Sequence, residues 1–191
     1  MTTNQQNPAT VAQLSAMEGD RQKFYYPPPA LAENSNIMAY AREKGFASVD
    51  ELHAWTIAHP QEFWAEMANR FLDWYQPWDK VLDDSNKPFF TLFTGAKTNV
   101  YHNAIERHLD GPNRDKVAII WESEQGETKT YTYAQMATEV NRFANALKHE
   151  GVQKGDRVTI YLSRVPELLI AMLAVVKIGA MHSVVYGGFS T

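Results

Sequence analysis

The order of apolar and polar positions divides the chain into a helical first part and an α/β second part. The run Pro27-Pro28-Pro29 favours an extended lead-in. Between residues 35 and 75, apolar side chains recur every three to four positions, the spacing of one helix face. From residue 116 onward, short apolar runs alternate with longer segments of helical spacing, which is typical of an α/β protein.

The helical part carries start and stop signals for three helices. Residue 35 or 36 can cap the first, because serine and asparagine accept hydrogen bonds from the first free N–H groups of a helix. Ser48 and Glu51 form the capping box of the second helix, and Pro60 ends it and begins the third. We expect the third helix to bury one apolar face, made of Phe63, Met67, Phe71 and Trp74.

The α/β part begins with a predicted hairpin over residues 116–131, formed by the runs KVAIIWE and ETKTYT. Thr132 and Gln135 then make a capping box that begins a helix, and Gly151 ends it. The apolar face of this helix comprises Met136, Val140, Phe143, Ala144 and Leu147.

The last 35 residues predict a strand–helix–strand unit, with strands at RVTIYL (157–162) and HSVVY (182–186). Such a unit pairs its strands in parallel through a right-handed crossover. The helix between them, PELLIAMLAVVKIG, is apolar on nearly all sides. Other parts of the protein must therefore pack against two sides of it. An apolar strand such as VVY is expected inside a sheet. We therefore expect more sheet than the chain supplies, and interpret the chain as the front of a larger α/β protein.

Composition narrows the class of protein further. The chain has 191 residues, 45% of them hydrophobic and 21% charged, as expected of a soluble globular protein. The net charge of −4, with scattered Lys and Arg, argues against nucleic-acid and membrane partners. The polar N-terminus lacks the apolar segment of a signal peptide, and the nine apolar residues 168–176 are too few to span a membrane. A cytoplasmic location is the expectation.

The common catalytic motifs are missing. The chain has no cysteine and no phosphate loop, dinucleotide fingerprint, zinc-protease helix or nucleophile elbow. The six histidines show no spacing suited to a metal site, so we expect no metal. Asp83-Asp84 stands beside Ser85 and Asn86, which indicates a turn rather than acid–base catalysis.

One stretch remains open to a binding role, namely Tyr186-Gly187-Gly188. It follows a predicted parallel strand, and ligands of α/β proteins bind beyond the carboxyl ends of such strands. Glycines there let backbone N–H groups approach a phosphate or a base edge. From spacing alone, a plain strand-end turn is the alternative interpretation.

Several stretches, read in order, resemble the acetyl-CoA synthetases, the short-chain AMP-forming acyl-CoA synthetases of the adenylate-forming superfamily. They are PPPALAENSNI, FWAEMA, PWDKVLD, NVYHNAIERHL, KVAIIWE, TYTYAQMATEVNRFANALKHEGVQKGDRVTIYL and PELLIAMLAVVKIGAMHSVVYGGFS. The resemblance runs from about Tyr25 to the end and is most specific in the last 75 residues. It implies an enzyme that activates a carboxylic acid with ATP and Mg as an acyl-adenylate, and then transfers the acyl group to CoA.

The resemblance also implies a domain plan: a flexible N-terminus at 1–22, the helical extension at 23–83, and the truncated start of the AMP-binding large domain at 84–191. The catalytic motifs of the family lie beyond Thr191, so the fragment is expected to be inactive and to bind none of the cofactors tightly. Tyr186, Gly187 and Gly188 correspond to the family's contact with the CoA nucleotide, where Phe is usual in place of Tyr186. The expected partners are the acid, ATP, CoA and the remainder of the chain.

Some residues depart from the family pattern. Ala96 and Thr98 stand where the family has Gly and Leu, and His102 and Glu106 stand where it has Tyr and Asp. These departures leave the acid open between acetate, propionate and another small acid. A non-catalytic module that binds CoA or a partner is the alternative hypothesis. A complete module is expected to be monodisperse, whereas an excised front part is expected to expose the 168–176 surface and self-associate.

Overall fold

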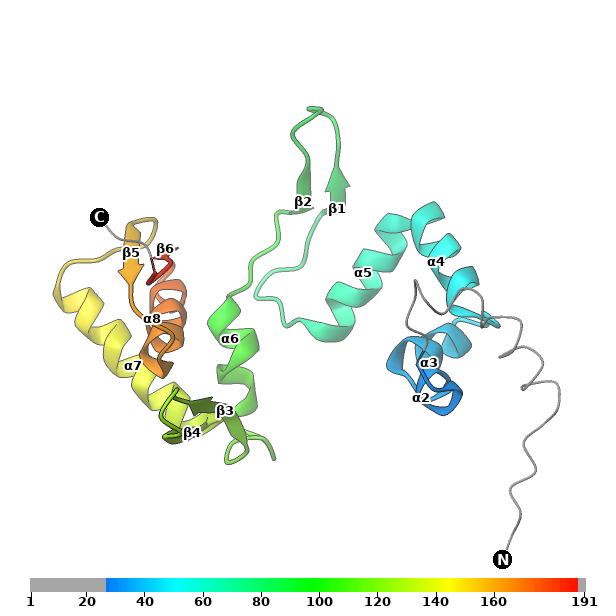
Figure 1. Ribbon diagram of the computed structural model, residues 1–191. Coiled ribbons are helices and arrows are strands. Elements are labelled where there is room, and N and C mark those ends of the chain that lie inside the picture. The colour runs from blue at the N-terminus through cyan, green and yellow to red at the C-terminus, as the bar shows by residue number, and fades with distance from the viewer. Residues whose placement is uncertain (1–26, 189–191) are drawn as a thin grey trace, which may run out of the picture. The chain divides into compact units, whose positions relative to one another are not determined.

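The computed structural model describes residues 27–188, and the chain divides into two compact units, residues 1–62 and 63–191. Helices make up the described part of the first unit, and the second mixes helices with three two-stranded sheets (Figure 1). The predicted α/β class with a helical N-terminal region is therefore confirmed. The predicted flexible segment 1–22 lies outside the described residues, and the proposed domain boundary at 83/84 stays a prediction.

The first unit contains α2 (Pro29–Glu33), α3 (Asn36–Glu43) and α4 (Val49–Ala58). Ser35 caps α3, since its Oγ accepts from the Met38 N–H at 3.3 Å. Ser48 caps α4, with its Oγ 3.1 Å from the Glu51 nitrogen. The predicted capping box of α4 is only half formed, because the Glu51 carboxylate accepts from Ala47 N–H at 2.8 Å.

The expected extended lead-in is wrong at its last residue. Pro29 is the first residue of α2, where a proline needs no N–H partner and its fixed φ already suits a helix. Pro28 precedes the helix with an extended backbone, at φ −52° and ψ 140°.

Helix α5 (Pro60–Phe71) begins at the predicted proline, but its predicted apolar face is only partly correct. Phe71 is 59% exposed, because the helix ends there and the chain turns away. Trp74 lies beyond the helix and donates its indole N–H to the carbonyl of Ala68 at 3.1 Å. Its ring packs against Trp78 and Phe93, so this aromatic cluster follows the helix instead of extending it.

An antiparallel hairpin that the sequence pattern did not predict follows, with strands β1 (Lys80–Asp83) and β2 (Thr91–Thr94). Its turn confirms the predicted role of the aspartate pair. Asp83 Oδ1 accepts from the Ser85 N–H at 3.2 Å, and Asp84 pairs with Lys87 at 2.8 Å. The strands are four residues long and exposed at Leu92, so they lack the clear alternation by which strands are recognised.

The helix over residues 100–108 is interrupted. Asn99 caps α6 (Val100–Ala104), and a short 3₁₀ helix, η1 (Glu106–His108), continues after Ile105. Asn99 also donates its side-chain N–H to the carbonyl of Val176 at 2.8 Å, which joins α6 to the end of α8 (Pro166–Lys177).

The hairpin predicted over 116–131 is confirmed as β3 (Val117–Glu122) paired with β4 (Thr128–Thr132). Helix α7 (Tyr133–His149) begins with both hydrogen bonds of the predicted capping box, between Thr132 and Gln135. Met136, Val140 and Ala144 are buried as expected, whereas Phe143 is 40% exposed. Phe143 lies at the edge of the contact between α7 and α8, so α8 covers only part of its side chain.

The strand–helix–strand unit is confirmed, since β5 (Arg157–Tyr161) and β6 (Met181–Val185) pair in parallel around α8. Figure 1 shows α7 and α8 side by side, with β5 and β6 next to α8. The core combines α6, α7 and α8 through buried residues such as Tyr101, Ile105, Val140, Leu173 and Ala174.

Strand β6 lacks cover among the described residues, as expected if the chain supplies less sheet than this strand needs. Val184 is 41% exposed and Tyr186 56% exposed, because β5 is the one strand that pairs with β6 among residues 27–188. Helix α8 buries most of the 168–176 surface against its neighbours, so the expected exposure of that surface is wrong, although Leu169 is 39% exposed.

Candidate functional site

The candidate site lies where β5 and β6 end. Tyr161 pairs with Val185 at the carboxyl ends of these parallel strands. Two loops therefore leave the sheet at the same edge, residues 162–165 after β5 and residues 186–188 after β6. This is the edge at which α/β proteins place ligands.

The two glycines let these loops approach each other closely. A Cβ at Gly187 would lie 3.3 Å from the carbonyl oxygen of Leu162 and 3.4 Å from the Cα of Ser163. A Cβ at Gly188 would lie 2.7 Å from Cε1 of Tyr186, so a larger residue there must displace the ring. The glycines thus keep Tyr186 and the two loops in one compact arrangement.

Arg164 is the residue of this edge that the sequence reasoning missed. Its guanidinium carbon lies 5.7 Å from the centroid of the Tyr186 ring. Its carbonyl oxygen accepts the indole N–H of Trp121, on β3, at 2.7 Å. A signal was available, since Arg164 stands in the loop after a predicted parallel strand, at the same edge of the sheet as Tyr186.

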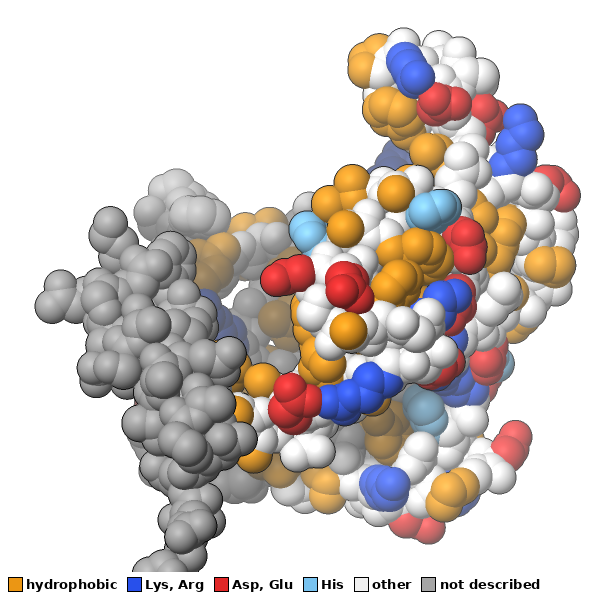
Figure 2. Space-filling model, turned by 90° about the vertical axis from the view of Figure 1, so that its right-hand side faces the viewer, with side chains coloured by type: hydrophobic (Ala, Val, Ile, Leu, Met, Phe, Trp, Pro, Cys, Tyr) orange, Lys and Arg blue, Asp and Glu red, His pale blue; other side chains and the backbone are white. Residues whose placement is uncertain are grey.

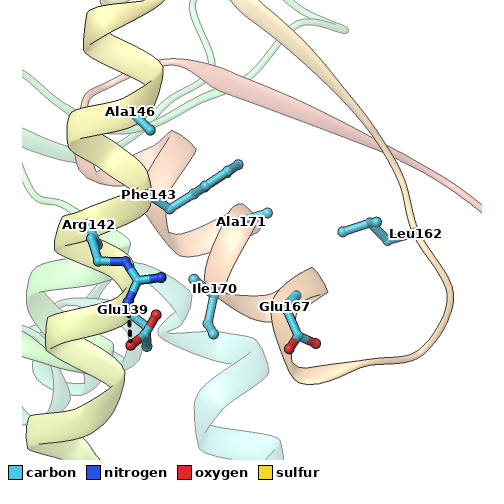
Figure 3. Close-up of a pocket in the computed structure, with 8 residues that line it drawn as sticks. All are labelled: Glu139, Arg142, Phe143, Ala146, Leu162, Glu167, Ile170 and Ala171. Atoms are coloured by element: carbon cyan, nitrogen blue, oxygen red, sulfur yellow. Dashed lines mark hydrogen bonds and ion pairs between the residues drawn. The ribbon is translucent and has the colours of Figure 1, made fainter.

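A groove of about 410 Å³ lies beside this edge, between α7 and α8 (Figure 3). Its apolar lining comes from Phe143, Ala146, Leu162, Ile170 and Ala171, and its charged lining from Glu139, Arg142 and Glu167. Figure 3 shows Arg142 and Glu139 paired on α7, with Glu167 across the groove at the start of α8. Leu162 is shared with the loop after β5, so the groove borders the candidate site.

A second polar cluster surrounds His102 in the same unit. Its Nε2 lies 3.3 Å from Asp73 Oδ2, and its Nδ1 lies 3.0 Å from Glu106 Oε2. Lys177 reaches the other oxygen of Glu106 at 3.4 Å and lies 3.8 Å from the centroid of the Tyr101 ring. The hydrogen bond from His102, together with Lys177, holds the pKa of Glu106 below its ordinary value. The two departures His102 and Glu106 are thus in contact, and the cluster links the chain after α5 to η1 and α8.

Metal sites and membrane-spanning helices are absent from the described part of the chain. Among residues 27–188, no group of His, Asp and Glu side chains is arranged to hold a metal ion. None of the helices in this part is long and apolar enough to cross a membrane. Figure 2 shows positive and negative side chains interspersed with hydrophobic ones on the face drawn.

The chain matches two family models that adjoin along the sequence. Residues 49–104 match the acetyl-coenzyme A synthetase N-terminus, and residues 105–191 match the AMP-binding enzymes. A solved acetoacetyl-CoA synthetase from Streptomyces lividans aligns with a TM-score of 0.75 at 26% identity, over 86% of this chain and 26% of that chain.

Curated relatives agree with these matches. The acetyl-coenzyme A synthetase of Methanothrix soehngenii is 45% identical over 176 residues, which are 90% of this chain and 26% of that protein. The 3-hydroxypropionyl-coenzyme A synthetase of Metallosphaera sedula is 52% identical over 132 residues, which are 69% of this chain and 20% of that protein. The chain spans about a quarter of the length of the curated relatives it matches.

The fold and these matches define the class as the adenylate-forming acyl-CoA synthetases. The chain belongs to the AMP-binding enzyme family, among the acetyl-coenzyme A synthetases and related short-chain synthetases, and it matches their N-terminal portion. The resemblance drawn from the sequence motifs is thereby confirmed.

Proposed function

We propose that this chain is part of an ATP-dependent, AMP-forming acid–CoA ligase, which makes a short acyl-CoA from an acid, ATP and CoA through an acyl-adenylate. The observation that carries the proposal is the ordered match of residues 49–191 to two adjoining family models. ATP with Mg would activate the acid, and CoA would accept the acyl group. The small-molecule partners follow from this reaction, and neither nucleic acid nor membrane belongs to it. A cytoplasmic location suits these substrates.

The acid belongs to the small carboxylic acids. Relatives of this chain are named for acetyl-CoA, 3-hydroxypropionyl-CoA and acetoacetyl-CoA. We propose acetate as the first candidate, with propionate and these hydroxy and keto acids as the comparison set. A panel of these acids, tested by acid-dependent ATP–pyrophosphate exchange with the full-length protein, identifies the substrate. Absence of exchange with every acid would contradict the ligase proposal.

Within this ligase, we propose that Tyr186, Gly187 and Gly188 contact the nucleotide half of CoA. The proposal is supported by their place at the carboxyl edge of β5 and β6 and by the close approach of the two loops. The tyrosine ring is 56% exposed and offers a face on which a base can stack. Acyl activation itself depends, in this proposal, on the part of the relatives that the chain does not match. Residues 1–191 alone are then inactive and bind the cofactors weakly.

Substitution of Gly187 by Val tests the CoA contact. The added side chain meets the backbone of Leu162 and Ser163, so we expect a shifted loop and a KM for CoA raised about tenfold or more. The exchange reaction, which needs no CoA, is expected to keep its rate. An equal fall of exchange and thioester formation would show that the loop is structural instead. Gly111→Val, in the exposed bend after η1 with open space around it, is the control for adding the same side chain at a glycine.

A further inference from the structure

Arg164 is a charged side chain held beside the proposed CoA loop. It lies in the loop after β5, and its guanidinium faces the ring of Tyr186 at 5.7 Å from the centroid. The face-on approach of a guanidinium to an aromatic ring is attractive, and it limits the positions that the arginine can take. The cation is therefore kept beside Tyr186, Gly187 and Gly188.

The backbone of Arg164 is anchored independently of its side chain. The indole N–H of Trp121 donates to the Arg164 carbonyl at 2.7 Å, across 43 positions of sequence. Lys129 lies over the same indole ring, 5.5 Å from its centroid. The hydrogen bond from Trp121 and the contact with the Tyr186 ring hold Arg164 in position before a ligand binds. This lowers the entropy cost of binding a ligand through Arg164.

The guanidinium of Arg164 is available to bind an anion. Among the described residues, no carboxylate lies within 4.0 Å of Arg164 to form an ion pair, and the residue is exposed. Its nearest acid along the chain, Glu167, lines the neighbouring groove from the first turn of α8. A planar guanidinium with free N–H groups suits phosphate, which it can bind with two parallel hydrogen bonds.

We propose that Arg164 binds a phosphate of the CoA nucleotide and is a specificity-determining residue of the ligase, an inference that rests on the proposed function. The nucleotide half of CoA carries a base, a pyrophosphate and a 3′-phosphate. In this proposal the glycines give the nucleotide room beside Tyr186, and Arg164 supplies the positive charge. Trp121 acts as a positioning residue through the Arg164 carbonyl.

The test uses the full-length protein with Arg164→Gln and Arg164→Lys, assayed with CoA and with dephospho-CoA, which lacks the 3′-phosphate. We expect Arg164→Gln to raise the KM for CoA about tenfold or more and to leave ATP–pyrophosphate exchange unchanged. Arg164→Lys keeps the charge but not the planar fork, so we expect an intermediate KM. If Arg164→Gln raises the KM for CoA but not for dephospho-CoA, the contact is to the 3′-phosphate. If it raises the KM for CoA and for dephospho-CoA equally, the contact is to the pyrophosphate.

Arg157→Gln is the matched control, because Arg157 is an exposed arginine at the amino end of the same strand, β5. We expect it to leave both KM values unchanged. The inference is overturned if Arg164→Gln leaves both KM values at the unmodified level, or if it lowers exchange and thioester formation together. The proposed function then stands, since the unmodified protein still makes acyl-CoA. If the unmodified protein makes no acyl-CoA from any acid, the proposed function fails and this inference fails with it.

Discussion

At Tyr101, the buried aromatic ring packs in the core, whereas the hydroxyl makes no hydrogen bond there. The side chain is 2% exposed in the α6–α8 core, and its hydroxyl has no hydrogen-bond partner in the described structure. Burial raises the pKa of this hydroxyl, so it stays protonated at neutral pH. The ring contacts the Lys177 ammonium at 3.8 Å and fills space between the helices. The ring contributes packing, while the hydroxyl carries a desolvation cost.

Replacing Tyr101 by Phe is therefore expected to keep the free energy of unfolding unchanged or raise it by about 1 kcal/mol. Tyr101→Ala, which removes the ring as well, is expected to cost about 3–5 kcal/mol. Urea denaturation of the two variants beside the unmodified protein measures both effects. A loss above about 1 kcal/mol for Tyr101→Phe would mean that the hydroxyl is satisfied after all.

At the scale of elements, the polar cluster around His102 links residues that belong to four different segments of the chain. His102 is on α6, Glu106 begins η1, Asp73 follows α5 and Lys177 ends α8. Arg107 adds a contact to Asp73 at 3.4 Å and donates to the carbonyl of Phe71 at 3.0 Å. Charge pairing thus links the chain after α5 to η1 and to the end of α8.

Glu106 gives this cluster a defined pH dependence. Because its folded pKa lies below its ordinary value of 4.5, its contribution is present above pH 4.5 and is lost as the pH falls through the lowered value. Glu106→Gln is expected to lower the free energy of unfolding by less than about 1 kcal/mol at pH 7, since the side chain is 45% exposed and screened by water. The difference from the unmodified protein should shrink below pH 4.5.

Urea denaturation at pH 7 and at several values below 4.5 measures that difference. Glu124→Gln, the same charge change in the exposed β3–β4 turn, is the control and is measured over the same pH series. A gap between Glu106→Gln and the unmodified protein that grows on acidification would contradict the assignment.

At the scale of the whole molecule, several apolar side chains are exposed on the short sheets. Phe89, Phe90 and Leu92 are more than half exposed on the β1–β2 hairpin, and Ile120 is 73% exposed on β3. Strand β6 has one paired edge among the described residues. Unpaired strand edges with apolar side chains are templates for association.

We therefore expect residues 1–191, produced alone, to self-associate. Light scattering coupled to size-exclusion chromatography over a concentration series would show a mass that rises with concentration. Met181→Lys places a charge on the exposed start of β6, where the side chain is 52% exposed, and is expected to weaken the association. A monomer at every concentration would contradict this expectation and favour a self-contained module.

The sequence by itself determined the features that depend on neighbours along the chain. The Ser35 and Thr132 caps, the β3–β4 hairpin and the parallel β5–α8–β6 unit follow from hydrogen bonds over a few residues and from apolar periodicity. The motifs that carry the family resemblance are equally local. The candidate loop at Tyr186 was predicted for the same reason, as a glycine pair after a strand.

The tertiary structure alone decided what lies around that loop. Trp121 and Arg164 are 43 positions apart, and Asp73 meets His102 across 29, so no local pattern could pair them. The exposure of Phe71, Phe143 and Val184 was also decided by which elements cover them. Periodicity tells which side chains share a face, but burial and pairing depend on the partner that the rest of the fold brings to that face.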